Sequence, residues 1–573
     1  MKNLIKYMLV VSVFTGVISC EKLEPIDENR LDYDYVSTDP ESAEGILLQG
    51  YAGLEDQYSF SETATDDAVN NKLNNGYKRM ALGELSALYN PASSWNSFEK
   101  VFYVNRFIEI VDAGTVQWNR DAEINELFNK RLKGEALALR ALHHFYVLQA
   151  HAGEAASGQL LGIPYFTEFI KADGNFNIPR LTLKESVNAI MKDFDDALAL
   201  LPTDYSDNLA DVDPWYSSVD FGKYKVVNGS QYNLRISGRI VKALKARLAL
   251  YVASPSFFNG QEGYYNIAAD VSSELLNSIG GVAGLAADGL EFYASDNDLS
   301  GDELLWRSSV GGSNSTYEKR MFPPSVNGTG EVNPTHNLVM SFPMKNGFPA
   351  TVTNGFDPQD PYTNRDPRLE KYIVVNGSSF GGGVINTGYG GKIDRLDSIS
   401  EFSTTTGYYL KKLLRPDVRI NNDGTTSDQK HVNVYFRYTE LFLILAEAAN
   451  EIGGPDHQVN GISARDVIAA IRNRAGITQP DVYLTTITTQ SAMRDLIRNE
   501  RRIELSFEGH RFWDLRRWGT SLNETAKGYF NDGSNYVELP SVEIRNYPSH
   551  AVYMPIPNSE TLKFPEIQQN KGW

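Results

Sequence analysis

The stretch that decides the fold is M-R-D-L-I-R-N-E-R-R-I-E-L-S-F-E-G-H-R-F-W-D-L-R-R-W, residues 493–518. Its first half has apolar side chains at steps of three and four residues, which places them on one face of an α-helix; they are Met493, Leu496, Ile497, Ile503 and Phe507. Gly509 follows where such a helix would stop, because a residue without Cβ adopts the left-handed C-cap conformation at little cost. The apolar face therefore needs a packing partner elsewhere in the chain.

The second half of the stretch combines large aromatic side chains with arginines. Burial of aromatic surface is favourable, and arginine planes can lie over tryptophan rings or pair with nearby acids. We interpret residues 510–518 as a plug that docks into the rest of the protein, with Trp513 and Trp518 in structural roles.

Several segments carry a family resemblance. Residues 500–519, E-R-R-I-E-L-S-F-E-G-H-R-F-W-D-L-R-R-W-G, resemble the C-terminal signature of the RagB/SusD family of surface glycan-binding lipoproteins. Residues 132–146 are similar to the family's first long repeat helix, and residues 364–369 to its Asp-Pro-Arg-Leu turn. The last residues also resemble the family's closing segment, although Lys571 stands where proline is expected. The resemblance covers nearly all of the mature chain.

Composition limits the class of protein and of partner. The chain has 573 residues, 42% of them hydrophobic and 11% aromatic, which is ample for a large core. A formal charge of -18 would repel nucleic acid and anionic lipid headgroups. We therefore expect no nucleic-acid partner, and a neutral ligand rather than an anionic one.

The N-terminus reads as a lipoprotein signal. Lys2 and Lys6 precede an apolar run over residues 8–18, which is too short for a membrane-spanning helix and ends at the only cysteine, Cys20. The segment favours a signal peptide over residues 1–19 and lipidation of Cys20, followed by a tether to residue 38. The alternative is a chance thiol beside an ordinary cleavage site. Acidic residues after Cys20 resemble the signal that sends Bacteroidetes lipoproteins to the cell surface, so we expect a lipid anchor on the outer membrane, facing outwards.

Helical periodicity dominates the mature chain and predicts a mainly α fold. Three pairs of helices resemble tetratricopeptide units: residues 125–150 with 183–201, 237–252 with 264–279, and 434–451 with 463–475. We expect a single domain over 39–573. Its helical scaffold would span about 39–280 and 432–573, and a loop-rich insertion at about 281–431 would contain short strands near 304–310 and 408–413.

No catalytic or metal motif stands out. The sequence has no H-E-x-x-H, nucleophile elbow, Walker loop or Rossmann glycine pattern, and His143, His144 and His151 are interpreted as structural. Residues 296–303 resemble a calcium loop, but the twelfth position is Arg307 and not the bidentate glutamate. We expect no cofactor, while a looser structural calcium site stays open. Accidental carboxylate pairs among 72 acids leave a glycosidase as an alternative.

Carbohydrate binding needs exposed aromatic rings beside polar side chains, and four places in loops qualify: residues 89–96, Trp215 with Tyr216, Trp306, and Tyr317. Trp306 follows Leu305 in the expected strand, and alternation should expose it. Trp95 could equally be core packing. The family resemblance implies a shallow site built from the early loops and the insertion, and it nominates Asp66, Asp67, Asn70, Trp95, Asn96, Trp306 and Arg368. Arg368 could instead stabilise its turn.

The resemblance also implies a function. The protein would bind an oligosaccharide or polysaccharide without cleaving it, as a lid over a TonB-dependent SusC-like transporter, and would deliver the glycan for uptake. The aromatic content fits a neutral glucan, such as a β-glucan. A helical-repeat scaffold that binds proteins and has no glycan affinity is the main alternative.

Overall fold

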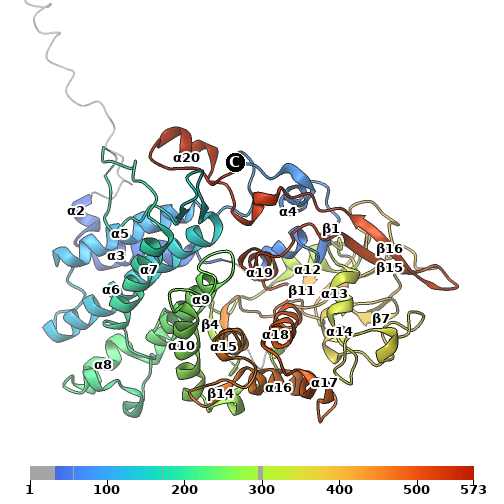
Figure 1. The fold of residues 1–573 in the computed structure, drawn as a ribbon. Helices are drawn as coiled ribbons and strands as arrows, with labels where there is room; N and C mark the ends of the chain where they lie inside the picture. The colour runs from blue at the N-terminus through green and yellow to red at the C-terminus, as the bar shows by residue number, and fades with distance from the viewer. Residues whose placement is uncertain (1–32, 56, 172, 295–300) are drawn as a thin grey trace, which may run out of the picture.

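The structure is a computed structural model that describes all residues except 1–32, 56, 172 and 295–300. The expected signal peptide and the lipidation site Cys20 lie outside the described residues. The fold is mainly α, as predicted, and its scaffold is of the tetratricopeptide type (Figure 1). Its longer helices are α3 (Pro40–Ala52), α5 (Ser97–Ala113), α6 (Ala122–His151), α7 (Leu183–Leu198), α9 (Gly238–Ala253), α10 (Tyr264–Ser278), α15 (Tyr438–Gly453), α16 (Ala464–Ala475), α18 (Gln490–Glu504) and α19 (Arg511–Trp518).

The three predicted helix pairs are confirmed. Helix α6 packs on α7, α9 on α10, and α15 on α16, while α10 also packs on α15 and so joins the early and late parts of the scaffold. Ala136, Ala138 and Ala141 of α6 are fully buried, because small side chains let neighbouring helices approach closely. Capping residues define where several helices begin. Thr182 and Glu185, for example, form a reciprocal capping box at the start of α7.

Shorter elements complete the fold. The shorter helices are α2 (Tyr33–Val36), α4 (Gly76–Arg79), α8 (Phe221–Asn228), α11 (Glu291–Ala294), α12 (Ser315–Met321), α13 (His336–Ser341), α14 (Pro367–Tyr372), α17 (Val482–Thr486) and α20 (Asn558–Lys563). The strands form antiparallel pairs: β1 (Ala68–Asn70) with β5 (Val332–Pro334), β2 (Gly153–Glu154) with β3 (Leu160–Leu161), β4 (Leu304–Arg307) with β12 (Val434–Arg437), β6 (Ile373–Val374) with β9 (Tyr409–Leu410), β7 (Ser378–Phe380) with β8 (Gly383–Ile385), β10 (Arg419–Ile420) with β11 (Thr426–Ser427), β13 (Gln458–Val459) with β14 (Ile462–Ser463), and β15 (Ala526–Asn531) with β16 (Tyr536–Glu543).

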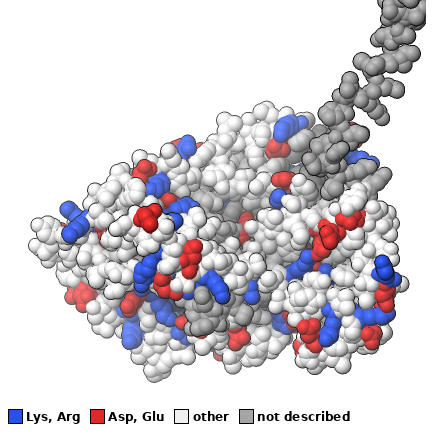
Figure 2. Space-filling model, turned by 180° about the vertical axis from the view of Figure 1, so that it is seen from behind, with Lys and Arg blue, Asp and Glu red and all other residues white. Residues whose placement is uncertain are grey.

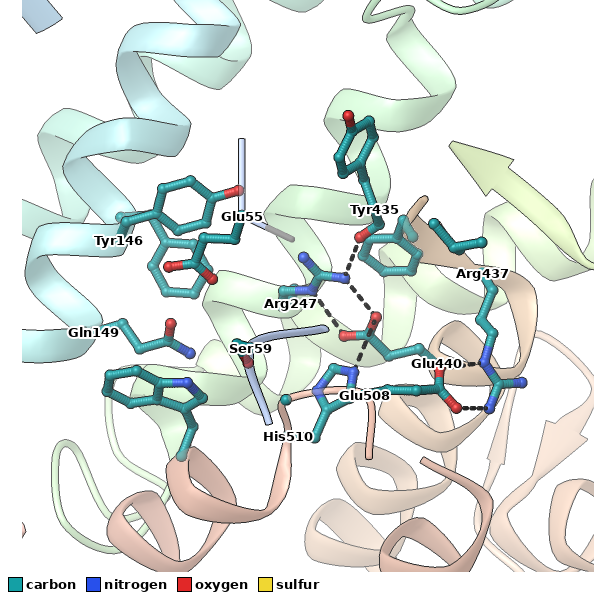
Figure 3. A pocket seen from close by; sticks show the side chains of 15 residues that line it. Glu55, Ser59, Tyr146, Gln149, Arg247, Tyr435, Arg437, Glu440, Glu508 and His510 are labelled. Atoms are coloured by element: carbon teal, nitrogen blue, oxygen red, sulfur yellow. Dashed lines mark hydrogen bonds and ion pairs between the residues drawn. The ribbon is translucent and has the colours of Figure 1, made fainter. Parts of the chain in front are cut away.

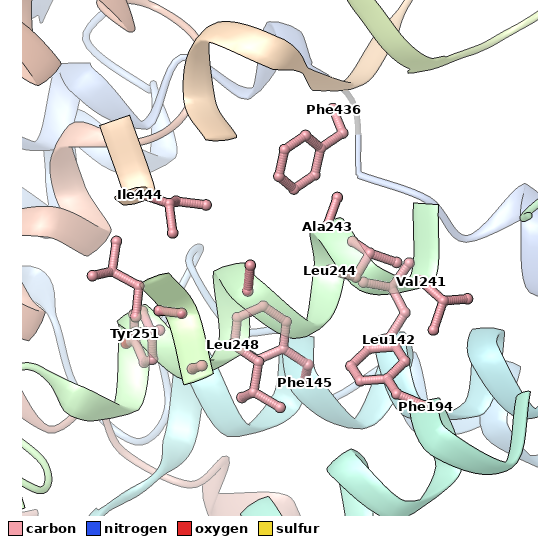
Figure 4. Packing of buried hydrophobic residues seen from close by; sticks show 14 of the residues in the cluster. Leu142, Phe145, Phe194, Val241, Ala243, Leu244, Leu248, Tyr251, Phe436 and Ile444 are labelled. Atoms are coloured by element: carbon pink, nitrogen blue, oxygen red, sulfur yellow. The ribbon is translucent and has the colours of Figure 1, made fainter. Parts of the chain in front are cut away.

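The two largest hydrophobic cores of the described residues follow this layout. The larger core lies among the scaffold helices and contains Leu142 and Phe145 of α6, Phe194 of α7, Leu248 of α9 and Ile444 of α15 (Figure 4). The second core is built mostly from the tract between α10 and α15 and also takes in side chains from the early loops and from the end of α18. In Figure 1, α18 and α19 lie between the blue-green scaffold and the yellow tract. The boundaries of the expected insertion remain a prediction.

Two local expectations were wrong. The expected helix at residues 434–451 begins only at Tyr438, because Val434–Arg437 is strand β12 and pairs with β4. The expected helix at the start of the decisive stretch ends at Glu504, before Gly509. Both Phe507 and Gly509 then adopt positive φ, 63° and 78°, so two left-handed residues make the turn into α19.

An ion-pair hub forms around three largely buried acids of the decisive stretch, Glu500, Glu504 and Glu508. Arg368 of α14 contacts Asp366 at 2.7 Å, Glu500 at 2.9 Å and Glu504 at 3.1 Å. Other cations converge on the same acids from other elements. The hub comprises Glu303, Asp366, Arg368, Lys412, Arg437, Arg472, Arg474, Asp481, Glu500, Glu504 and Glu508. It ties α14, β12, α16 and α18 together across the two cores.

Buried histidines predict acid sensitivity. Burial lowers the pKa of His143 to about 4 and of His144 and His151 to about 3, whereas an unfolded histidine titrates near 6.5. The unfolded state therefore takes up protons first as the pH falls. We expect the free energy of unfolding to keep its full value above about pH 6.5 and to decrease by several kcal/mol by about pH 4. Melting temperatures between pH 7.5 and 4 test this, and a melting temperature that stays constant down to pH 5 would contradict it.

Candidate functional site

Two adjoining hollows lie where the scaffold meets α19, and we call them together the groove. The first has a volume of about 110 Å³ and the second about 260 Å³. They share Glu55, Ser59 and Trp513 in their walls, so they are neighbouring parts of one surface depression. Figure 2 shows acidic and basic side chains interspersed over one face of the molecule.

An ion pair forms one wall of the first hollow (Figure 3). Arg247 of α9 donates to Glu440 of α15 through Nε at 2.7 Å and through Nη2 at 2.5 Å. The same Nη2 donates to the carbonyl oxygen of Tyr435 at 3.1 Å. His510 stands 4.0 Å from Glu440, and burial lowers the pKa of His510 to about 4, so its ring is neutral at pH 7.

Glu55 lies on the opposite side of this hollow, next to Tyr146 (Figure 3). Part of its side chain is exposed, but the surrounding walls desolvate the carboxyl group and raise its pKa to about 7, against the opposing influence of Arg247. For Glu440, burial would also raise the pKa, but Arg247 and His510 outweigh it and the net shift is downward. Glu508 also lines this hollow, and Arg437 and Lys412 lower its pKa to about 2 against the effect of burial. The hollow thus has two firmly ionised carboxylates and one carboxyl group that gains a proton near neutral pH.

Amides and hydroxyls line the rest of the groove. Gln149 of α6 borders the first hollow, while Asn96, Ser93 and Ser94 border the second. Within the part of the chain that the structure describes, the side-chain amides of Gln149 and Asn96 make no hydrogen bond. Both are therefore available to a ligand with hydroxyl groups.

Trp513 is the aromatic ring that borders both hollows. Its neighbours in α19 turn inward: Phe512 is fully buried and Leu515 is 5% exposed. Trp513 remains half-buried, with Phe512 edge-on at 5.2 Å and the Arg516 guanidinium 5.1 Å from its ring. Arg516 is itself held by the carbonyl oxygens of Val552 and Gln149, each at 3.0 Å. The ring is thus fixed by packing while it still borders open space.

Two of the sequence-predicted residues lie at or beside the groove. Asn96 is exposed and lines the second hollow. Its neighbour Trp95 is half-buried and packs edge-on to Phe98 at 5.0 Å and to His151 at 5.3 Å. The sequence left two roles open for Trp95, ligand platform and core packing. Its contacts are those of core packing.

Asp66, Asp67 and Asn70 are buried and do not present free groups. Arg502 contacts Asp66 at 2.7 Å and Asp67 at 2.5 Å, and Arg511 contacts Asp66 at 3.0 Å. Asn70 is 2% exposed, and its side chain accepts from the backbone N–H of Lys72 at 2.8 Å. The expectation that these residues face a ligand does not fit their burial; the acids instead anchor the early loop to the decisive stretch.

Arg368, Trp306 and Tyr317 are also engaged inside the protein. Arg368 belongs to the ion-pair hub and is 3% exposed. Trp306 is 2% exposed, so the predicted exposure was wrong: β4 pairs with β12, Trp306 packs on Tyr435 at 4.9 Å, and its indole N–H donates to Leu234 O at 3.1 Å. Tyr317 is half-buried and stacks on Tyr58 at 4.2 Å. Trp215 is the most exposed of the proposed aromatics but does not line the groove.

Sequence reasoning missed Trp513 and Gln149 as members of the candidate site. The sequence did contain a sign that Trp513 is less buried than its neighbours. Phe512, Leu515 and Trp518 recur at three-residue steps and share one helix face, and Trp513 does not lie on that face. No comparable signal marks Gln149, which follows an almost wholly apolar run.

Comparisons with known proteins agree with this architecture. One family model, described as the SusD family, matches residues 302–573, and another, described as starch-binding associating with outer membrane, matches residues 32–213. The chain belongs to the SusD-like family.

Solved structures share the fold of this SusD-like protein. One SusD-like protein from Bacteroides fragilis gives a TM-score of 0.73 at 24% identity and covers 95% of this chain and 99% of its own. A SusD-like carbohydrate binding protein from the same organism gives 0.69 at 21% identity, covering 93% and 99%. Surface glycan-binding protein A from Bacteroides fluxus gives 0.60 at 19% identity, covering 94% and 100%. At these identities the likeness establishes the fold.

Curated relatives match over shorter segments. A SusD-like protein of Formosa agariphila is 30% identical over 244 residues, which are 39% of this chain and 43% of the relative. A second one from this organism is 34% identical over 84 residues, 15% of this chain and 16% of the relative. The match thus spans less than half the length of either curated relative.

Membrane and metal features were sought in the same described residues. None of the helices there is both long and apolar enough to cross a membrane. No group of three histidine, cysteine or acidic side chains in the described part could hold a metal ion. The calcium-like segment at 296–303 lies mostly outside the described residues.

Proposed function

We propose that this SusD-like protein binds an oligosaccharide or polysaccharide in the groove without cleaving it. The observation that carries the proposal is the ring of Trp513 between two hollows, with the unengaged amides of Gln149 and Asn96 on either side. An aromatic face with a few convergent polar groups suits sugar rings, whose faces are apolar and whose rims carry hydroxyls. The family descriptions and the printed name of the carbohydrate-binding neighbour support the same class of ligand.

The proposal extends to location and partner. The protein would be anchored on the outer membrane through lipid on Cys20 and exposed at the cell surface, in keeping with the outer-membrane association in one family description. Bound glycan would be delivered to a TonB-dependent SusC-like transporter. Since the chain carries a formal charge of -18, we propose a neutral glucan, such as a β-glucan, as the ligand of the groove.

Three acids line the groove, Glu55, Glu440 and Glu508, so the glycosidase alternative has a concrete form. A retaining or inverting enzyme needs one protonated acid and one carboxylate free to attack or to activate water. Glu55 could be the acid, but both oxygens of Glu440 accept hydrogen bonds from Arg247, and Glu440 is 2% exposed. Both oxygens of Glu508 likewise accept hydrogen bonds from Arg437, at 2.7 and 2.9 Å. Binding without cleavage therefore fits the geometry better, and release of reducing ends that stops in Glu55→Gln would contradict it.

The test of glycan binding is the substitution Trp513→Ala. Loss of the ring should lower the affinity about tenfold or more, as for aromatic anchors in other binding sites. Affinity electrophoresis through gels that contain neutral or acidic polysaccharides identifies the ligand and compares the variants. Trp215→Ala is the matched control, since Trp215 is 57% exposed and lines neither hollow.

The outcomes separate the proposed functions. Retardation by one polymer that is lost in Trp513→Ala and kept in Trp215→Ala supports glycan binding in the groove. Equal retardation of both variants and the unsubstituted protein would mean that the glycan binds outside the groove. Retardation by no polymer, together with co-purification of a barrel, would favour the protein-binding scaffold.

A further inference from the structure

A third hollow, separate from the groove in its lining, opens on the scaffold beside α18. Its volume is about 740 Å³. Its walls come from the connection between α9 and α10, from the start of α10, from the end of α15, from α18 and from Trp518 at the end of α19. The volume falls within the range of small-molecule sites.

Arg498 of α18 lies in this wall without an acidic partner. Within the described residues it makes no ion pair, and its buried Nε has no hydrogen-bond partner. What holds the side chain is the ring of Trp518, 4.6 Å from the guanidinium carbon. This contact with the ring restrains the side chain without engaging the N–H donors of the guanidinium.

The acids next to Arg498 are already paired with other arginines. Arg494 contacts Glu451 at 2.5 and 2.6 Å through two nitrogens. Arg517 contacts Glu447 at 2.5 and 2.6 Å. Each of these pairs is neutral, so Arg498 leaves one uncompensated positive charge at the wall of the hollow. Burial lowers the pKa of Arg498, but an arginine stays protonated near neutral pH.

The remaining wall offers groups suited to a sugar. Tyr265 is half-buried, and the exposed amides of Asn259 and Asn266 make no hydrogen bond in the described part of the chain. Asn259, Gly260 and Gly263 have φ values of 48°, 78° and 74°, so left-handed residues shape the loop that carries Asn259 and leads into α10, which carries Tyr265 and Asn266. A Cβ at Gly260 would stand 3.6 Å from the ring of Tyr265, which shows that the ring lies close over the loop.

We propose that this hollow is a second carbohydrate subsite, and that it takes a sugar carrying a carboxylate, such as a uronic acid residue. Arg498 binds the carboxylate through its free donors, Tyr265 contacts the ring, and Asn259 and Asn266 hydrogen-bond hydroxyl groups. A single uncompensated arginine matches a monoanion. Its planar donors match the two oxygens of a carboxylate. The local charge thus opposes the preference for neutral ligands that the overall charge of -18 suggests.

Only the choice of a sugar as the carrier of the carboxylate rests on the proposed function. The two proposals can therefore fail separately. Trp513→Ala should lose neutral-glycan binding and keep binding of the acidic sugar. Arg498→Gln should do the reverse.

The experiment is isothermal titration of the purified protein with a galacturonic acid oligosaccharide and with the galactose oligosaccharide of equal length. We expect binding of the acidic ligand only, and a loss of roughly tenfold to a hundredfold in affinity in Arg498→Gln, the factor for a charge-assisted hydrogen bond. Arg498→Lys keeps the positive charge but lacks the paired N–H donors of a guanidinium. Its affinity for the acidic oligosaccharide should lie between those of the unsubstituted protein and Arg498→Gln. Arg120→Gln is the matched control, because Arg120 is exposed and lines none of the three hollows.

Three results would overturn the proposal. One is equal binding of the acidic and neutral oligosaccharides that persists in Trp513→Ala, where the groove no longer contributes. Another is unchanged affinity for the acidic oligosaccharide in Arg498→Gln, with a melting temperature like that of the unsubstituted protein. The third is binding of a sulfated galactose oligosaccharide but not of the galacturonic one, which would assign the arginine to sulfate esters.

Discussion

Arg368→Ala is expected to destabilise the protein by about 3–5 kcal/mol, the range for removing one partner of a buried ion pair. The guanidinium of Arg368 is 3% exposed and contacts three acids, Asp366, Glu500 and Glu504. Without it those carboxylates stay buried with fewer cations to balance them. Urea unfolding at pH 7, followed by tryptophan fluorescence, measures the change.

The matched control for this prediction is Arg120→Ala, which removes an exposed arginine and should change stability by less than about 0.5 kcal/mol. Arg368→Ala should also leave the glycan affinity of the folded protein close to that of the unsubstituted protein, because Arg368 does not line the groove. A variant with normal stability and lost glycan binding would return Arg368 to the list of ligand-contacting residues.

The helical scaffold could be predicted from the sequence because its causes are local. Apolar residues at helical spacing and small residues such as Ala136 and Ala141 define faces that must pack, and the predicted helix pairs do contact one another. Strand β12 could not be found in this way, since Val434–Arg437 is short, begins with three largely apolar residues and merges into the pattern of the helix that follows. Its strand geometry depends on β4, which is far away in the sequence.

The ion-pair hub was beyond sequence reasoning for a related reason. Charged residues are ordinarily exposed, and burial becomes favourable only when partners converge from several elements. Glu504, for example, contacts Arg474 at 2.7 Å and Arg368 at 3.1 Å, and these arginines lie on different helices. Periodicity placed Glu504 on α18 but gave no information about its partners.

The candidate site shows the same limit for aromatic residues. The sequence identified which residue types could hold a sugar, but the exposure of each ring depends on tertiary neighbours. Trp513 was assigned to the core and borders the groove, whereas Trp306 was assigned to the surface and is 2% exposed. Asn96 kept its predicted exposure because it stands at the start of α5, where the chain turns at the surface.

Trp306→Ala is expected to destabilise the protein by about 3–5 kcal/mol, the usual cost of truncating a buried tryptophan. The indole packs in the larger core against Tyr435 at 4.9 Å, and its N–H donates to Leu234 O at 3.1 Å. Alanine would leave a cavity between β4 and the scaffold and an unpaired carbonyl oxygen. Thermal and urea unfolding measure the loss.

Trp306→Phe is the informative companion, since it keeps most of the packing and removes the hydrogen bond, so it should cost about 1–3 kcal/mol. Tyr435 connects Trp306 to the groove, so Trp306→Ala should weaken glycan binding by the folded protein less than Trp513→Ala does. The reverse order, with a stable Trp306→Ala that no longer binds glycan, would mean that the strand pair β4–β12 opens and exposes Trp306 to the ligand. The buried position of Trp306 would then describe only the unliganded protein.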